Sequence, residues 1–140
     1  MVVLNRRYHF AASHRLHSPQ LSADENREVY GKCNNPFGHG HNYTLQVSVA
    51  GPVNAATGMV INLATLDAVV RREVLDRLHE SNLNLDSGLF DNSVPTTENL
   101  CIVIFNLLKS PLSGLPEAPG SFLKRIRVEE TASNFFEYSG

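Results

Sequence analysis

The stretch HGHNYTLQVSV, residues 39–49, alternates between two kinds of side chain, and this alternation decides the fold. One parity carries His41, Tyr43, Leu45, Val47 and Val49, and the other carries Asn42, Thr44, Gln46 and Ser48. Successive side chains of a β-strand point to opposite faces. The pattern therefore predicts an antiparallel strand over 41–49 with one buried face and one polar face.

Flanking segments extend this strand into an α+β pattern. Residues 2–14 alternate in the same way and predict a second strand, with Phe10, Ala12 and His14 on one face. Asn62 is a typical helix cap, and apolar residues at helical spacing predict a helix from 63 to 78. Pro95-Thr96-Thr97-Glu98 predicts the start of another helix, which ends before Pro111.

A hairpin at 124–131 and 135–138 completes the order ββααββ. This order predicts an antiparallel sheet with two helices on one face. A chain of 140 residues is long enough for one domain, so we expect a single domain over residues 1–140.

Composition and charge exclude several classes of partner. The net charge is −2 and the isoelectric point is near 6.3, which argues against binding to nucleic acid or to an anionic membrane. The densest apolar segment, LCIVIFNLL at 100–108, is too short to span a bilayer. The first residues lack the apolar run of a secretion signal, so we expect a cytoplasmic protein whose two cysteines are free thiols.

Three histidines point to a metal site. His39 and His41 are two apart, so in a strand that begins at His39 they face the same way with Cα atoms about 6.6 Å apart. His14 ends the neighbouring predicted strand on its apolar face. Three imidazoles with an open fourth position are typical of catalytic zinc. The alternative is a polar HGH turn and a buried, hydrogen-bonded His14.

Two further residues carry chemistry. Cys33 lies in a long segment between the first two strands, beside Lys32 and six residues before His39. A nearby cation would lower the pKa of its thiol and make it a base, although Cys33 could instead be a fourth zinc ligand. Glu130 falls on the apolar parity of its predicted strand, with Phe122, and needs a cationic or N–H partner unless it reaches solvent.

The runs FAASHRL, YGKCNNPFGHGHNY, TGMVINLATL, PTTENL and VEETASN resemble the 6-pyruvoyl-tetrahydropterin synthase and 6-carboxy-tetrahydropterin synthase family over nearly the whole chain. The resemblance implies the T-fold, in which trimers close into a β-barrel and pair as a homohexamer. It implies a zinc-dependent carbon–oxygen lyase that acts on a phosphorylated small molecule. The implied reaction converts 7,8-dihydroneopterin triphosphate to 6-pyruvoyl-tetrahydropterin and triphosphate, as in tetrahydrobiopterin biosynthesis.

Site residues are implied position by position. His14, His39 and His41 match the zinc ligands, and Cys33 matches the catalytic base. The positions that bind the pterin are Glu130, Thr96 and Thr97. Among basic residues, Arg15 and Lys32 are candidates for the triphosphate. The spacing C-x5-H-G-H favours the pyruvoyl branch over the 6-carboxy branch of queuosine biosynthesis, which typically has C-x3-H-G-H.

One departure concerns the proton relay. The family usually has Leu-Asp-His after its first helix, and this chain has Leu78-His79-Glu80. We expect His79 to be the proton shuttle, because histidine both gives and takes a proton near neutral pH. Glu80 or Asp76 would support it. A pterin-binding homologue with altered activity is the alternative.

Overall fold

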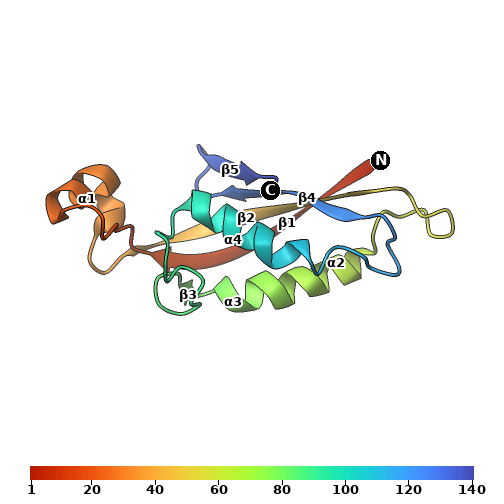
Figure 1. Cartoon of the computed structure of the whole chain (residues 1–140), viewed down its shortest axis with the longest axis horizontal. Coiled ribbons are helices and arrows are strands. Elements are labelled where there is room, and N and C mark those ends of the chain that lie inside the picture. The colour runs from red at the N-terminus through yellow and green to blue at the C-terminus, as the bar shows by residue number, and fades with distance from the viewer.

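A five-stranded sheet forms the frame of the molecule, and the computed structural model describes all residues from 1 to 140 (Figure 1). The strands are β1 (Val2–His14), β2 (His39–Gly51), β3 (Ser81–Asn82), β4 (Phe122–Glu129) and β5 (Phe135–Tyr138). Their spatial order is β3-β1-β2-β4-β5, and each neighbouring pair is antiparallel except β1 with β3. The four predicted strands are confirmed, whereas β3 was not predicted because two residues show no alternation.

The two helices predicted from their caps are confirmed, and the structure contains shorter helical segments as well. They are α1 (Ala23–Tyr30), the 3-10 helix η1 (Gly31–Asn34), α2 (Leu63–Val70), the π-helical segment η2 (Arg71–Leu75), α3 (Asp76–Leu78) and α4 (Thr97–Lys109). The α2, η2 and α3 segments form one continuous helix over the predicted range 63–78. It begins at Asn62, whose side chain accepts a hydrogen bond from the backbone N–H of Ala64.

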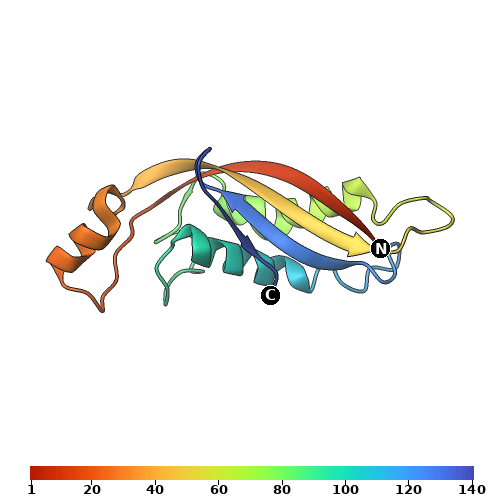
Figure 2. The same cartoon turned by 90° about the horizontal axis from the view of Figure 1, so that it is seen from above.

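The long helices cover one face of the sheet, and the core lies between these two layers (Figure 1). Fully buried residues from both layers include Leu45, Val47, Ile126, Leu66 and Ile104. Helix α1 lies beyond one end of the sheet, away from α2 and α4, and the N-terminus lies at the opposite end (Figures 1 and 2). None of the helices is both long and apolar enough to cross a membrane.

A β-bulge corrects one sequence prediction. The pairing of β2 with β4 shifts register between Ser48 and Val49, so that Leu123 rather than Phe122 turns toward the core. Phe122 is therefore 42% exposed, while Leu123 is buried. A bulge inserts one extra residue and reverses the alternation beyond it. Glu130 lies after the last paired residue of β4, on the side of the bulge where the predicted parity holds.

Candidate metal centre and its surroundings

The ends of β1 and β2 bring the three predicted histidines together. The antiparallel register places His14 opposite His39 and Ala12 opposite His41. The ring centroids are 5.4 Å apart for His14 and His39, 5.0 Å for His14 and His41, and 4.5 Å for His39 and His41. This geometry confirms the prediction that strand pairing gathers the three imidazoles at one end of the sheet.

His14 is oriented by the start of α4. Its Nδ1 lies 2.9 Å from the carbonyl oxygen of Pro95. A carbonyl can only accept, so Nδ1 carries the proton and Nε2 keeps a free lone pair. That Nε2 atom is buried and has no hydrogen-bond partner, and burial lowers the pKa of the ring. A neutral histidine held through Nδ1 is the usual state of a metal ligand.

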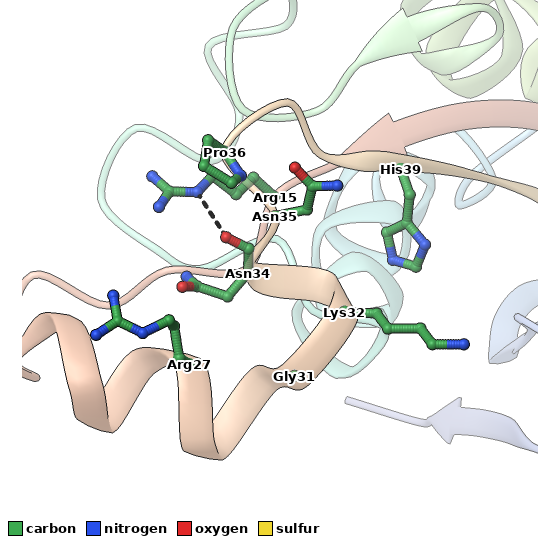
Figure 3. A pocket seen from close by; sticks show the side chains of 8 residues that line it. All are labelled: Arg15, Arg27, Gly31, Lys32, Asn34, Asn35, Pro36 and His39. Carbon is green, nitrogen blue, oxygen red and sulfur yellow. Dashed lines mark hydrogen bonds between the residues drawn. The ribbon is translucent and has the colours of Figure 1, made fainter.

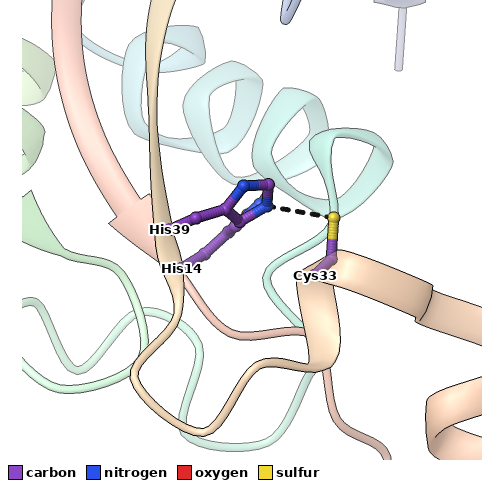
Figure 4. Close-up of side chains that lie close together, drawn as sticks. All are labelled: His14, Cys33 and His39. Atoms are coloured by element: carbon purple, nitrogen blue, oxygen red, sulfur yellow. Dashed lines mark hydrogen bonds between the residues drawn. The ribbon is translucent and has the colours of Figure 1, made fainter.

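Cys33 and His39 form a close pair next to His14 (Figure 4). The Sγ atom of Cys33 lies 3.1 Å from Nε2 of His39. Cys33 belongs to η1, and its carbonyl accepts a backbone hydrogen bond from Leu16 at 2.7 Å, which ties this segment to the chain leaving β1. Burial, followed by the negative charge of Glu130, raises the pKa of the thiol. This is opposite to the lowering expected from Lys32, and a cation bound at the site would lower the pKa of the thiol again.

His41 and Glu130 form a second pair across β2 and the end of β4. Nε2 of His41 lies 3.1 Å from Oε1 of Glu130, and both side chains are 15% exposed. The angle does not satisfy a hydrogen bond, so Nε2 of His41 also lacks a partner. Burial lowers the pKa of His41, and the charge of Glu130 opposes that effect. The Nδ2 group of Asn134 donates to Oε2 of Glu130 at 3.3 Å.

The donor atoms fit a metal ion. The candidate donors form two groups, and within each group the donor atoms lie within 4.8 Å of one another. His14 belongs to both groups. One group is His14, Cys33 and His39, and the other is His14, His41 and Glu130. Nitrogen, sulfur and carboxylate donors in this combination are those that zinc binds. An ion among them would also satisfy the two buried imidazole nitrogens that lack partners.

The predicted threonines have different surroundings. Thr96 is the N-cap of α4, and its Oγ1 accepts from the backbone N–H of Asn99 at 3.2 Å. Thr97 is buried, and its Oγ1 has no partner. The Tyr43 hydroxyl is likewise buried without a hydrogen bond of good geometry. Burial, then the charge of Glu130, raise the pKa of Tyr43, while the side chain of Thr97 beside it opposes that rise. Tyr43 was not predicted as a site residue, because it reads as an ordinary core position of β2.

A basic pocket opens beside His39 (Figure 3). Its volume is about 450 Å³, and its lining includes Arg15, Arg27 and Lys32 but no acidic residue. Arg15 is partly held, since its Nε donates to the carbonyl of Asn34 at 3.2 Å. Arg27 was not predicted here, because its place depends on how α1 continues into η1. Asp24 pairs with the guanidinium of Arg27, whereas neither Arg15 nor Lys32 forms an ion pair, so the pocket keeps a positive charge that can bind a polyanion next to the candidate metal site.

His79 and Glu80 lie just before the edge strand β3, and Glu80 lines a pocket that also includes His41. Nδ1 of His79 accepts from the backbone N–H of Ala11 at 3.1 Å, and Nε2 lies 3.6 Å from Oε1 of Glu80. Neither side chain forms a hydrogen bond or ion pair with Cys33 within the chain. Asp76, at the start of α3, is exposed and makes no ion pair with His79.

Comparison with known proteins identifies the family of this chain. The family model described as 6-pyruvoyl tetrahydropterin synthase matches residues 3–140. This chain belongs to that family. It is 44% identical to 6-pyruvoyl tetrahydrobiopterin synthase of Drosophila melanogaster over 98% of this chain and 79% of the relative. The solved structure of 6-pyruvoyl tetrahydropterin synthase from Caenorhabditis elegans superimposes with a TM-score of 0.90 at 43% identity, covering 99% of this chain and 95% of that one.

Members of the 6-carboxy branch are more distant. The 6-carboxy-5,6,7,8-tetrahydropterin synthase of Bacillus subtilis is 28% identical over 96% of this chain and 83% of the relative. The family assignment and the T-fold expected from the sequence are therefore confirmed. The order of identities agrees with the C-x5-H-G-H spacing, which favours the pyruvoyl branch.

Proposed function

We propose that this chain is a zinc-dependent lyase that converts 7,8-dihydroneopterin triphosphate to 6-pyruvoyl-tetrahydropterin and inorganic triphosphate. The observation that carries the proposal is the convergence of His14, His39, His41, Cys33 and Glu130 at one end of the sheet. Relatives at 41–44% identity are named for this reaction.

The three histidines would each hold zinc through Nε2. Nε2 lacks a hydrogen-bond partner in His14 and His41, and in His39 it faces Cys33. Bound zinc supplies Lewis acidity toward the hydroxyl groups of the substrate side chain. Cys33, on the cluster's rim, takes a proton from a side-chain carbon once the cation has lowered the pKa of its thiol.

Glu130 would bind the pterin ring. Its carboxylate now faces His41 and Asn134, both of which bind it weakly or at a poor angle. The amino group and adjacent ring N–H of a pterin form a paired donor that matches a carboxylate. The unpartnered hydroxyls of Thr97 and Tyr43 offer further hydrogen bonds beside it. Thr96 contributes indirectly, because its side chain caps the helix that positions Thr97.

The basic pocket would receive the triphosphate. Arg15, Arg27 and Lys32 line it together with His39, so a substrate held at the metal would place its phosphates among these cations (Figure 3). This arrangement extends the expectation for Arg15 and Lys32 by adding Arg27 from α1.

We expect the active form to be a hexamer of two trimers. β3 covers only Ala12 and Ser13 on the outer edge of β1, and β5 leaves its own outer edge unpaired. Closing copies into a ring would pair these edges and remove the exposed strand edges. The catalytic site would then lie between copies, because Glu130 adjoins the β5 edge.

The test is an assay of triphosphate release with product identification. Zinc-loaded protein is incubated without oxygen with 7,8-dihydroneopterin triphosphate, and His14→Ala is the matched control. Release of triphosphate with a 6-pyruvoyl product, absent in the control, supports the proposal. A 6-carboxy product would place the chain in the other branch. Zinc and pterin binding without any release would identify a binding protein, the alternative that the His79-Glu80 pair favours.

A further inference from the structure

The hairpin turn that joins β4 to β5 holds the carboxylate of Glu130 from one side. The backbone N–H of Glu130 donates to the carbonyl of Asn134 at 3.3 Å, which closes the turn. The Nδ2 group of Asn134 donates to Oε2 of Glu130 at 3.3 Å. Glu130 and Asn134 are half-buried, whereas the three residues between them are exposed. The backbone and the carboxylate of Glu130 are therefore bonded to the same residue.

The direction of the Asn134 amide is fixed by Thr131. Oγ1 of Thr131 accepts from the backbone N–H of Ser133 at 3.2 Å, and its hydroxyl donates to Oδ1 of Asn134. With Oδ1 facing Thr131, the other end of the amide, Nδ2, faces Glu130. The reversed amide would set its oxygen against the carboxylate, which can only accept. Both contacts of the amide therefore favour the same orientation.

The second oxygen of Glu130 faces the candidate metal centre. Oε1 lies 3.1 Å from Nε2 of His41, and Glu130 forms a group of possible metal donors with His14 and His41. Nε2 of His41 is the atom proposed to hold zinc. A carboxylate is a common zinc ligand, and from this position it could close the site that a catalytic zinc keeps open. Glu130 thus has two competing uses, as a metal ligand and as the acceptor for a pterin ring.

We propose that Asn134 and Thr131 are positioning residues, which keep the carboxylate of Glu130 away from the metal and available to the pterin. The inference rests on the proposed function. The Asn134 amide binds one carboxylate oxygen, so turning Glu130 toward the metal would break a hydrogen bond to a charged group. Each carboxylate oxygen can accept more than one hydrogen bond, so this bond leaves room for the paired N–H donors of a pterin.

The role predicts that zinc affinity and pterin affinity change in opposite directions. Asn134→Ala frees Glu130, so the Kd for neopterin, an unphosphorylated pterin, should rise by roughly tenfold, the usual effect of losing a hydrogen bond to a charged group. Zinc should bind at least roughly threefold tighter, because Glu130 becomes an additional ligand. Pterin fluorescence measures the first affinity on zinc-loaded protein, and competition with a chelator measures the second without pterin. Loss of both affinities together would indicate a damaged fold and would overturn the positioning role.

Other positions of the turn supply graded variants and a matched control. Thr131→Val removes the hydroxyl that orients the amide and should raise the Kd for neopterin by roughly threefold, while Thr131→Ser keeps a hydroxyl and should stay within about twofold of the wild type. Ser133 contributes its backbone N–H to this turn, so Ser133→Ala is the control and should bind both ligands normally. Equal neopterin affinity in Thr131→Val and the wild type would overturn the role of Thr131.

Removing the carboxylate tests whether Glu130 causes the change in zinc affinity. Asn134→Ala combined with Glu130→Gln should bind zinc no tighter than Glu130→Gln alone, because the group that reaches the metal is gone. A gain in zinc affinity that persists in the double variant would overturn the proposal. If the wild type binds zinc and neopterin and Asn134→Ala binds both equally well, this inference fails while the proposed function stands. If the wild type binds neither, the proposed function fails, and this inference fails with it.

Discussion

The two ends of the β1–β2 pair have the same backbone pairing, but their polar side chains differ in whether they have hydrogen-bond partners. At the end that contains the N-terminus, Ser48 donates to Asn5, and Arg6 and Tyr8 both bind Asp67. At the other end, Nε2 of His14, Nε2 of His41 and the hydroxyl of Tyr43 are buried without partners. All buried side-chain nitrogen and oxygen atoms of β1 and β2 that lack a hydrogen-bond partner lie at the histidine end.

An unsatisfied buried polar group costs about 1–3 kcal/mol, so a cluster of them destabilises the sheet locally unless a ligand completes their bonds. The paired end contributes stability only. The unpartnered groups at the histidine end lower the stability of the fold but are available to bind a ligand, as is common at functional sites. The comparison predicts that substitutions at the histidine end change binding and turnover, while substitutions at the paired end change stability.

The largest expected effect is loss of the metal. His14→Ala removes the donor that belongs to both groups of candidate ligands, so zinc content should fall from about one per chain to near zero, and turnover should fall to background. Zinc is measured by elemental analysis of the purified protein. Asp67→Asn at the paired end is the matched control and should keep its zinc. Full zinc occupancy in His14→Ala would show that the ligand set is wrong.

Cys33→Ala should separate chemistry from metal binding. If the thiolate is the base, this variant keeps zinc but loses roughly two to four orders of magnitude in turnover. Zinc content and single-turnover rates are measured on the same preparation. Loss of zinc along with activity would contradict the assignment and identify Cys33 as a ligand, which its 3.1 Å contact with His39 permits.

The two thiols should react at very different rates. Cys33 is partly exposed, whereas Cys101 is 1% exposed, and burial raises the pKa of Cys101 to about 12. Alkylation at neutral pH, followed by peptide mass spectrometry, should modify Cys33 at least roughly tenfold faster. Zinc should increase this difference, because it lowers the pKa of a neighbouring thiol. Equal rates in the zinc-loaded protein would contradict an activated Cys33.

The basic pocket should affect substrate binding more than chemistry. Lys32→Ala removes one of three cations and should raise KM for the triphosphate substrate by roughly tenfold with little change in kcat. The exposed Lys124 of β4 lies outside the pocket, and Lys124→Ala is the matched control. A rise in KM of the same size in both variants would indicate a general charge effect rather than a phosphate site.

The sequence predicts those parts of the site that local patterns encode. His39 and His41 stand out because HGH begins an alternating strand, and His14 because it ends the next one. Their convergence follows from antiparallel pairing alone. The surroundings of Cys33 are less predictable, since the thiol pKa depends on burial and on Glu130 rather than on its neighbour Lys32.

Contacts between a side chain and a distant backbone have no sequence signal. Nδ1 of His79 meets the N–H of Ala11 across 68 positions of the chain, and nothing in the pattern of either segment indicates this bond. Sequence reasoning favours His79 as shuttle because histidine exchanges protons near neutral pH. The structure adds that Nδ1 of His79 is already occupied by the backbone N–H of Ala11, which no sequence pattern indicates. The bulge that turns Phe122 outward is a similar case, since it depends on how two strands accommodate one extra residue.

The smallest expected effect is at the paired end, where Asp67 accepts from Arg6 at 3.0 and 2.9 Å and from Tyr8 at 2.7 Å. The hydrogen bonds from Arg6 and then Tyr8 lower the pKa of Asp67 below its usual 3.8. A carboxylate with a lowered folded-state pKa stabilises the protein above its unfolded pKa, and this contribution is lost as pH falls through the folded value.

Asp67→Asn should therefore be less stable than the wild type at pH 7 and pH 5, by up to about 1 kcal/mol because the pair is partly exposed. The difference should shrink as the pH falls below about 4. Urea unfolding at pH 7, 5 and 3 measures this difference. Titration of the histidine end contributes equally to the unfolding free energy of both proteins, so it does not affect the difference between them. Salt at 1 M should reduce the difference at pH 7, since screening weakens exposed ion pairs. A difference that grows toward pH 3 would mean that Asp67 does not stabilise the paired end through its charge.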